Sequence, residues 1–391
     1  MLGAAVVLAV GAAFDWVGPS RTKMVAAPPD LTLTDESEAS AARSAAQPLE
    51  GTSFEPARIY AARAEGVVTI FAFFNADAGA TGGQGSGFVV SEDGYILTSS
   101  HVVTNAGGDE PRNVQAAAHV FVEFRDGDRV AARVVGWDLF DDIAVLKVDP
   151  ERHPLAPVPL GDSSAVQVGE PVAAIGSPFG AENSLATGVV SAIERTIPAL
   201  TSSFSLVDAI QIDAPINRGN SGGPLFDARG RVIGINAQIR SNSGLAEGVG
   251  FAVPINAAKR SMDQLIDRGT VAYGYVGVRA DDLWPALARR LGLNVTRGAL
   301  IADVIPDGPA DEAGFQGGGK SLTFQGAEIS TGGDVVVGVD GIRIRSADDL
   351  VRIVTNSLTP GEDAVFTIIR DNRRLDVPVH VTERPSGPSS G

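Results

Sequence analysis

From residue 67 to residue 255 the chain is a series of short, apolar and β-branched runs separated by turns, and this feature constrains the fold most. Two of the turns, Ser91-Glu92-Asp93-Gly94 and Arg125-Asp126-Gly127-Asp128, have the Gly and Asp content of hairpin loops. Strands are predicted at Val67–Phe74, Gly87–Val90, Tyr95–Thr98, Val120–Phe124, Arg129–Val135, Ile143–Val148, Val172–Ile175, Gly188–Ile193, Ala209–Ile212, Val232–Ala237 and Gly250–Val253. Because almost no helical periodicity interrupts these runs, the pattern predicts antiparallel barrels or a sandwich.

Helical periodicity first becomes clear at Asn256–Arg268, just before Gly269, a residue type that often follows the last helical turn. Beyond it the pattern mixes both kinds of element. Strands are predicted at Tyr275–Arg279, Ala299–Val304, Val335–Val339 and in a closing hairpin of Phe366–Arg370 and Arg373–Val381, with helices at Leu283–Leu291 and Ser346–Ser357. The sequence therefore predicts a second domain that contains both helices and strands.

The two ends of the chain differ in composition from these domains. Leu2–Phe14 is an apolar or small-residue run, which is typical of a signal-peptide core and also of the remainder of a membrane anchor. We expect one of these over residues 1–17, and hence export across a membrane. Residues 18–55 and 384–391 have no apolar periodicity and are predicted to be a flexible linker and a flexible tail. The two folded domains are then expected at 56–269 and 270–383, a division that suits 391 residues.

Charge and cysteine content exclude several classes of function. The formal net charge is −16 and the chain has no Lys/Arg-rich run, so a phosphate backbone would be repelled over most of the surface and nucleic acid is not expected as a partner. The chain has no cysteine, which excludes a thiolate nucleophile, a cysteine-ligated zinc site and a disulfide framework.

Three segments carry the residue types of nucleophilic catalysis. His101 follows a predicted strand, Asp142 precedes another, and Ser221 lies in the turn Gly219-Asn220-Ser221-Gly222-Gly223. A serine hydroxyl becomes a good nucleophile when a histidine accepts its proton and a buried carboxylate orients that histidine. The glycines would let backbone N–H groups converge on the oxygen of a tetrahedral intermediate. The order His, Asp, Ser is that of trypsin-like enzymes, and it differs from the orders in subtilisins and α/β-hydrolases.

Each of these residues can also be interpreted as having only a structural role. Asp141 stands beside Asp142 as a rival for the acid, and a serine in a glycine-rich turn is often only part of the turn. A histidine near a strand end is commonly structural, as we expect for His119, His153 and His380. The coincidence of all three segments, in order and within a strand-rich domain, favours catalysis.

Two further motif matches are rejected, because the elements predicted around them do not fit the folds that those motifs require. Gly314–Ser321 matches a phosphate-binding loop, but such a loop must open a helix, whereas Leu322-Thr323-Phe324 is predicted as strand. Gly219-x-Ser221-x-Gly223 also matches the nucleophile elbow of α/β-hydrolases. That fold needs a helix after the serine, and the sequence predicts a hairpin there.

Together these motifs resemble those of the HtrA/Deg family of serine proteases, and the resemblance runs from about Val67 to Val381. The segments that carry it are Gly85–Val89, Leu97–Val103, Asp142–Leu146, Gln211–Leu225 and Gly250–Pro254. The resemblance implies a mainly β protein: a trypsin-like double six-stranded β-barrel followed by a PDZ (α+β) domain. It places the catalytic acid at Asp142, with His101 and Ser221 completing the triad.

The resemblance also implies binding residues. The oxyanion hole would consist of the backbone N–H groups of Gly219 and Ser221, with Asn220 as a further candidate. Ile216 and Ile239 would line the pocket for a small aliphatic residue before the scissile bond, unless both are only core residues. In the PDZ-like domain, Tyr275-Val276-Gly277-Val278 resembles the loop that binds a peptide carboxylate. An insertion at Phe315–Thr331 is longer than the common family pattern and is predicted to be a hairpin.

The sequence thus predicts a serine endopeptidase that cleaves unfolded or exposed polypeptide segments, in protein quality control or regulated proteolysis. By resemblance it would act outside the cytoplasm as a homotrimer, tethered to a membrane or free, and its PDZ domain would bind peptide C-termini. The chemistry requires no cofactor and no metal. The alternative is a non-catalytic chaperone or scaffold whose protease domain is dormant.

Overall fold

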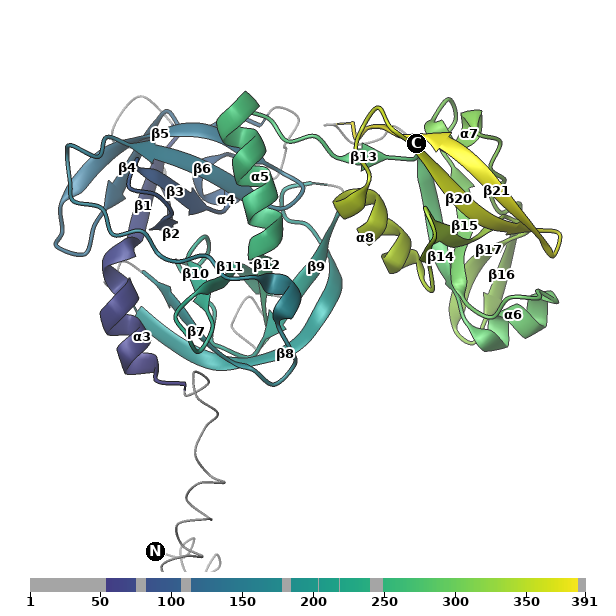
Figure 1. Ribbon diagram of the computed structural model, residues 1–391, viewed down its shortest axis with the longest axis horizontal. Helices are drawn as coiled ribbons and strands as arrows, with labels where there is room; N and C mark the ends of the chain where they lie inside the picture. Colours follow the sequence, from purple (N-terminus) through teal and green to yellow (C-terminus); the bar gives the residue numbers. More distant parts are fainter. Residues whose placement is uncertain are drawn as a thin grey trace, which may run out of the picture. The chain divides into compact units, whose positions relative to one another are not determined.

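The computed structural model describes residues 54–74, 82–106, 114–177, 184–202, 204–217, 219–239 and 249–385, without the side chains of 238 and 239 (Figure 1). The predicted signal peptide or anchor remnant and most of the predicted linker and tail lie outside these ranges. None of the helices within these ranges is both long enough and apolar enough to cross a membrane.

Six strands close a first antiparallel barrel in the order β1-β2-β3-β6-β5-β4. They are β1 (Val67–Phe73), β2 (Gly82–Val89), β3 (Tyr95–Thr98), β4 (His119–Glu123), β5 (Arg129–Asp138) and β6 (Ile143–Val148). Both predicted hairpins are confirmed, because β2 pairs with β3 and β4 with β5 across the expected turns. Val68, Ile70, Val122 and Leu146 fill the interior.

A second barrel closes in the order β10-β11-β12-β9-β8-β7. Its strands are β7 (Pro171–Gly176), β8 (Ser184–Pro198), β9 (Ser205–Ile212), β10 (Pro224–Phe226), β11 (Val232–Ile239) and β12 (Gly250–Pro254). Strands β8 and β9 are longer than the runs predicted at Gly188–Ile193 and Ala209–Ile212. Most residues of β8 are exposed or half-buried, so its ends carry no continuous apolar run that a sequence pattern could reveal.

Helices join and flank the barrels. The predicted helix Asn256–Arg268 is confirmed as α5 (Ile255–Arg268), which ends at Gly269 in the left-handed region at φ +75°. It contacts strands of both barrels, and Leu265 shares a buried cluster with residues of each. The sequence pattern did not predict α3 (Pro56–Arg63), since Ile59 is the one buried side chain in it. Short 3₁₀ turns occur at Ala64–Gly66 and Ser163–Ala165.

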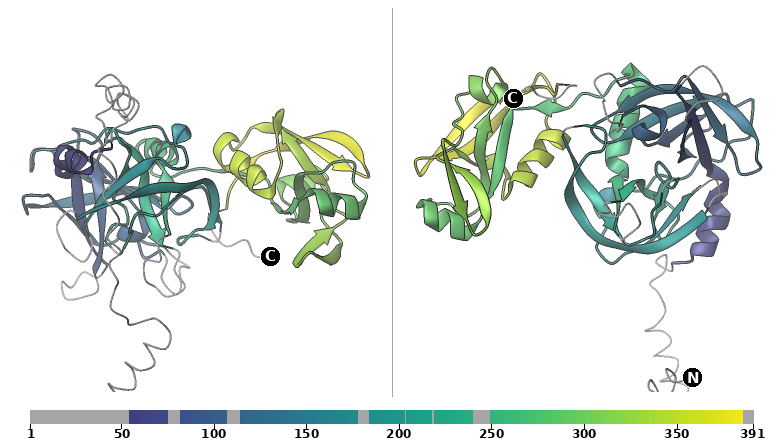
Figure 2. Two further views of the ribbon diagram at one scale, coloured as in Figure 1. Left: turned by 90° about the horizontal axis from the view of Figure 1, so that it is seen from below. Right: turned by 180° about the vertical axis from the view of Figure 1, so that it is seen from behind.

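The remaining chain forms a sheet in the order β14-β15-β18-β20-β21, with β19 beside β18, and two separate strand pairs, β13-β22 and β16-β17. The strands are β13 (Gly274–Tyr275), β14 (Val278–Leu283), β15 (Gly298–Val304), β16 (Lys320–Phe324), β17 (Ala327–Thr331), β18 (Val335–Val339), β19 (Ile342–Arg343), β20 (Asp363–Arg370), β21 (Arg373–His380) and β22 (Thr382–Glu383). The helices are α6 (Pro285–Leu291), α7 (Pro309–Glu312) and α8 (Ala347–Ser357), and α8 contacts β14 and β15 (Figure 2).

Several predictions for this region are confirmed. Ser346 caps α8 by accepting a hydrogen bond from the Asp349 backbone N–H at 3.0 Å. The insertion forms the hairpin β16-β17, and β16 begins at Lys320 within the phosphate-loop match, so a strand stands where that loop would need a helix. The closing hairpin pairs β20 with β21.

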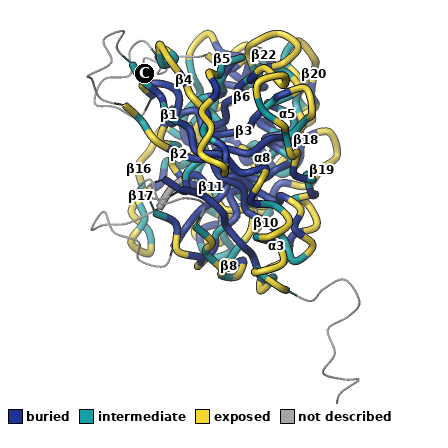
Figure 3. Tube along the Cα trace, turned by 90° about the vertical axis from the view of Figure 1, so that its left-hand side faces the viewer, coloured by how far each residue is buried: buried dark blue, intermediate teal, exposed yellow. Residues whose placement is uncertain are grey.

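Two local features differ from the prediction. The strand expected at Tyr275–Arg279 is divided into β13 and β14, because Gly277 adopts φ +74° and turns the backbone. Arg384, expected at the start of the flexible tail, is only 8% exposed. Its backbone N–H donates to the Tyr273 carbonyl at 2.9 Å, which extends the strand pairing of β13 with β22. Figure 3 shows that buried residues lie mainly along the strands and exposed residues at the turns.

Candidate active site

Asp142 and His101 form a tight pair in the first barrel. His101 lies in α4 (Ser100–Val103), the turn after β3, and Asp142 precedes β6. Asp142 Oδ2 accepts from His101 Nδ1 at 2.7 Å, while Oδ1 accepts from the His101 backbone N–H at 3.0 Å and from Ser100 Oγ at 2.8 Å. The carboxylate is 5% exposed, so these donors replace the water that burial removes.

This pairing sets the chemistry of the imidazole. With Nδ1–H donated to Asp142, the other ring nitrogen of His101 is left with its lone pair, the tautomer that a general base requires. Burial alone would lower the pKa of His101, but the charge of Asp142 and its hydrogen bond outweigh burial and raise that pKa above 6.5. The imidazole is a stronger base than a free histidine as a result.

Asp141, the rival acid, faces a different set of partners. It is 3% exposed, and its Oδ2 accepts from the Tyr273 hydroxyl at 2.9 Å. Asp142 adopts φ +53°, a left-handed conformation that redirects the chain between the two residues. Of these neighbouring carboxylates, it is Asp142 that contacts His101.

Ser221 lies in the second barrel, in the loop between β9 and β10, and Ser86 of β2 ties this loop to the first barrel. The Ser86 backbone N–H donates to the Ser221 carbonyl at 2.8 Å, and Ser86 Oγ donates to the Gly219 carbonyl at 2.5 Å. Ser86 stands within the family motif Gly85–Val89, and no role was predicted for it from the sequence. The sequence does contain a feature that could have indicated this contact. Ser86 lies between two glycines at the start of a predicted strand, and glycines in a strand let another backbone approach closely.

Gly222 allows a close approach of the two barrels at this site. Its φ is +83°, and a Cβ there would lie 2.3 Å from the Ser86 carbonyl oxygen and 2.3 Å from Thr98 Oγ1. It would also lie 2.9 Å from the backbone nitrogen of Ser99, two residues before His101. Both the conformation and the space therefore require glycine, and they bring the Ser221 loop against the segment that carries His101.

The Ser221 hydroxyl is engaged elsewhere in this structure. Its Oγ donates to the carbonyl of Ala237 on β11 at 3.1 Å. Within the described part of the chain it makes no hydrogen bond to His101. The structure therefore brings His101 and Asp142 together and places the Ser221 loop beside them, with the hydroxyl turned toward β11.

The backbone of the loop carries donors without acceptors. Among the described residues, nothing accepts from the N–H groups of Gly219 and Ser221. The Asn220 N–H, in contrast, donates to the Asn217 carbonyl at 3.0 Å, and the Asn220 side chain is buried. Gly219, at φ +103°, and Ser221 are thus the two members of the predicted oxyanion hole whose N–H groups remain free within the described chain.

The predicted substrate pocket receives less support. Ile216 is 2% exposed and belongs to the core of the second barrel, where a Cβ on Gly250 would lie 2.9 Å from its Cγ1. This placement favours the alternative that Ile216 is a core residue. The side chain of Ile239 lies outside the described part of the structure.

The second predicted site, Tyr275–Val278, lines an apolar groove of about 120 Å³. Strand β14 and helix α8 provide most of the other walls, through Ala280, Leu350, Val351 and Val354. The carbonyls of Val276 and Gly277 accept from the N–H groups of Ala310 and Ile305 at 2.9 and 2.8 Å. Because C=O and N–H point in opposite directions across a trans peptide, the following two N–H groups project away from these partners.

Comparisons with known proteins agree with this architecture. Residues 85–235 match the model of a trypsin-like peptidase domain, and residues 274–381 match that of a PDZ domain. A relative from Halomonas elongata, named "Probable periplasmic serine endoprotease DegP-like", is 42% identical over 301 residues, 77% of this chain and 56% of the relative. A similar relative from Brucella suis is 40% identical over 303 residues, 78% of this chain and 53% of the relative.

A solved structure titled "HtrA-type protease AlgW with tripeptide" has a TM-score of 0.68 at 32% identity and covers 86% of this chain and 99% of its own. The serine endoprotease of Yersinia pestis has a TM-score of 0.59 at 27% identity, with 85% and 99% covered. The chain spans little more than half the length of the curated relatives but nearly all of these solved chains. The chain therefore belongs to the HtrA/Deg family, with a trypsin-like peptidase domain followed by a PDZ domain.

Proposed function

We propose that this chain is a serine endopeptidase that cleaves unfolded or exposed segments of other polypeptides. Ser221 is the nucleophile, His101 the general base and then the general acid, and Asp142 the residue that orients His101. The observation that carries the proposal is the pair of hydrogen bonds from His101 to Asp142, one from the ring and one from the backbone. They fix the imidazole beside the Ser221 loop.

The proposed reaction proceeds through an acyl-enzyme. Ser221 Oγ attacks the scissile carbonyl carbon while its proton passes to the free ring nitrogen of His101. The C–N bond then breaks, and His101 gives the proton to the departing amine. Water, deprotonated by His101, attacks the ester carbonyl and releases the second peptide fragment, which restores the Ser221 hydroxyl. Asp142 stays ionised and stabilises the imidazolium formed in each half.

The N–H groups of Gly219 and Ser221 are the proposed donors to the oxygen that becomes negative in each tetrahedral intermediate. Asn220 does not join them in this arrangement, because its N–H is already donated to Asn217.

One observation favours a second candidate function. The hydrogen bond from Ser221 Oγ to the Ala237 carbonyl has to break before Ser221 reaches His101, which requires a rotation about the Ser221 Cα–Cβ bond. A chain that keeps this arrangement would bind peptides without cleaving them. The rival function is accordingly a peptide-binding chaperone or scaffold.

The PDZ domain is proposed to capture peptide C-termini by adding them as a strand beside β14, with their carboxylates at the loop Tyr275–Val278. The curated relatives are named periplasmic, which supports an extracytoplasmic location for this chain. We further propose that the chain forms a homotrimer and that it acts in protein quality control or regulated proteolysis.

The test is casein degradation by the full chain and by Ser221→Ala, each with and without peptides that end in an apolar residue. Ser91→Ala, in the β2–β3 turn, is the matched control. We expect Ser221→Ala to lose at least about 10⁴-fold in rate, while Ser91→Ala keeps the parent rate. Parent protein that is folded and inactive under every condition would favour the peptide-binding function instead.

A further inference from the structure

Arg384 is a buried cation at the end of strand β22. It is 8% exposed, and its guanidinium carbon lies 5.1 Å from the ring centroid of Phe140, 4.9 Å from Phe204 and 5.2 Å from Tyr273. Rings at this distance attract a cation through their π-faces. The two phenylalanines belong to the peptidase domain, so this aromatic cage is built from both domains.

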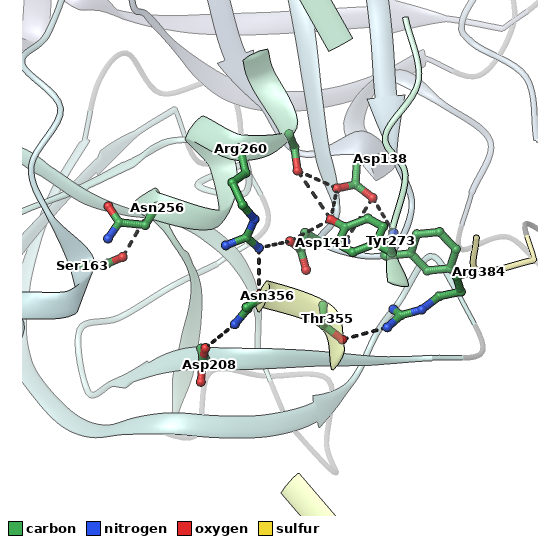
Figure 4. A network of polar contacts seen from close by, with 12 residues as sticks. Asp138, Asp141, Ser163, Asp208, Asn256, Arg260, Tyr273, Thr355, Asn356 and Arg384 are labelled. Atoms are coloured by element: carbon green, nitrogen blue, oxygen red, sulfur yellow. Dashed lines mark hydrogen bonds and ion pairs between the residues drawn. The ribbon is translucent and has the colours of Figure 1, made fainter. Parts of the chain in front are cut away.

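The hydrogen-bonding capacity of this guanidinium is largely unused. Nη2 donates to Thr355 Oγ1 at 2.7 Å, a contact drawn as a dashed line in Figure 4. Nε is fully buried without an acceptor, and Nη1 likewise has no acceptor among the described residues. A buried guanidinium with one neutral acceptor is costly, because burial removes its water and most of its donors remain unpaired.

The nearby carboxylates already have other partners. The Tyr273 hydroxyl hydrogen-bonds both Asp138 and Asp141, Ser261 Oγ donates to Asp138 at 2.7 Å, and Arg260 pairs with Asp141 at 3.7 Å (Figure 4). Arg384 forms no ion pair with either carboxylate within the described chain. The cage therefore holds a positive charge close to negative charges but without a direct anionic partner among the described residues.

The position of Arg384 indicates what that partner is. Its side chain lines the apolar groove together with Gly277 and Val278 of the loop, and it donates to Thr355 near the last turn of α8. An extended peptide that entered beside β14 would end here. A carboxylate is the anion that such a peptide carries, and a guanidinium binds it with strong, charge-assisted hydrogen bonds.

We propose that Arg384 binds the C-terminal carboxylate of a peptide seated in this groove. The proposal rests on the peptide-capturing role proposed above for the PDZ domain and adds a side-chain cation to the backbone loop. The ligand class is a polypeptide with a free C-terminus and an apolar last residue, since the groove is small and apolar beside the guanidinium. Internal segments and amidated ends lack the charge that Arg384 requires.

The test measures binding to the full chain carrying Ser221→Ala, which prevents cleavage of the probe. The probes are three fluorescent decapeptides that differ only in their last residue, Val, Leu or Phe, each made as the free acid and as the carboxamide. Fluorescence anisotropy gives the ratio of the two Kd values for each pair. The variants are Arg384→Met, which keeps an unbranched side chain, Arg384→Lys, which keeps the charge, and the control Arg352→Met. Arg352 lies on α8 outside the groove and pairs with Glu194 at 2.7 Å.

We expect Arg384→Met to reduce the preference for acid over carboxamide by about tenfold or more, Arg384→Lys to restore part of it, and Arg352→Met to leave it at the parent value. A loss of packing alone would weaken both peptide forms equally and leave the ratio unchanged. An unchanged ratio in Arg384→Met therefore overturns the assignment of Arg384 while the groove itself stands. If the parent binds none of the free acids, the peptide-capturing role fails, whatever casein degradation shows.

Discussion

Asp142 and Asp141 are adjacent in sequence, but their carboxylates lie in two regions with different electrostatic surroundings. At the candidate active site Asp142 is the acceptor for Ser100, for the His101 backbone and for the His101 ring, so one carboxylate receives several donors. At the domain junction Asp141 and Asp138 both accept from the Tyr273 hydroxyl, so two buried carboxylates lie next to one another. Burial, followed by the charge of Asp138, raises the pKa of Asp141 to about 7.

The difference shows that burial by itself does not decide what a carboxylate does. Both side chains are nearly inaccessible, at 3% and 5% exposed. The surroundings of each carboxylate differ: Asp142 accepts from Ser100 and His101, whereas Asp141 lies beside a second carboxylate, whose charge adds to burial in raising the pKa of Asp141. We therefore expect Asp142 to control catalysis and Asp141 to control how stability depends on pH.

The largest expected effect is on kcat/KM, which should distinguish Asp142 from Asp141. Asp142→Asn should lower kcat/KM about 10⁴-fold, because an amide no longer fixes the tautomer of His101 or stabilises the imidazolium. Asp141→Asn should change kcat/KM by less than about tenfold, since Asp141 does not touch His101. Both are measured on one peptide substrate at pH 8. Equal losses would show that the two regions act as one unit.

The second prediction concerns the acid limb of the pH–rate profile. His101 must be neutral to accept the Ser221 proton, and its pKa is raised above 6.5. The midpoint of kcat/KM should therefore lie above pH 6.5, with about a tenfold fall for each further pH unit below it. The same midpoint is expected in Asp141→Asn. A shift of the midpoint in that variant would mean that the junction charge reaches the active site.

The smallest expected effect concerns the free energy of unfolding and arises from Asp141 at the domain junction. The pKa of Asp141 is raised in the folded state from 3.8 to about 7. The folded protein thus binds more protons than the unfolded chain in this window, and its stability falls as pH rises through it. From pH 6 to pH 8 the loss should be about 1 kcal/mol in the parent. Asp141→Asn should show this loss much reduced when denaturant unfolding is compared at the two pH values, and an identical pH dependence would contradict the assignment.

How far the sequence predicted the fold depended on the type of element. Alternating or continuous apolar runs predicted most of the barrel strands, and Gly269 predicted the end of α5. The three-residue strand β10 is too short to form such a run and was predicted only as part of a hairpin. The helix α3 and the ends of β8 were missed, because their residues are mostly exposed and leave no periodic apolar signal. The strand at Tyr275–Arg279 was predicted as continuous. Glycine can adopt either an extended or a left-handed conformation, so the sequence did not indicate the left-handed turn at Gly277.

The sequence by itself determined which residue types stand at the candidate site, because His101, Asp142 and Ser221 lie in motifs whose order and composition favour nucleophilic catalysis. Only the tertiary structure showed that Asp141 shares the Tyr273 hydroxyl with Asp138, where the Ser221 hydroxyl points, and that Arg384 is buried within an aromatic cage. Motifs are local and are written in the order of the chain. Burial, the direction of a side chain and the balance of charge around it depend on residues far apart in that order, which only the packing of the two barrels and the PDZ domain brings together.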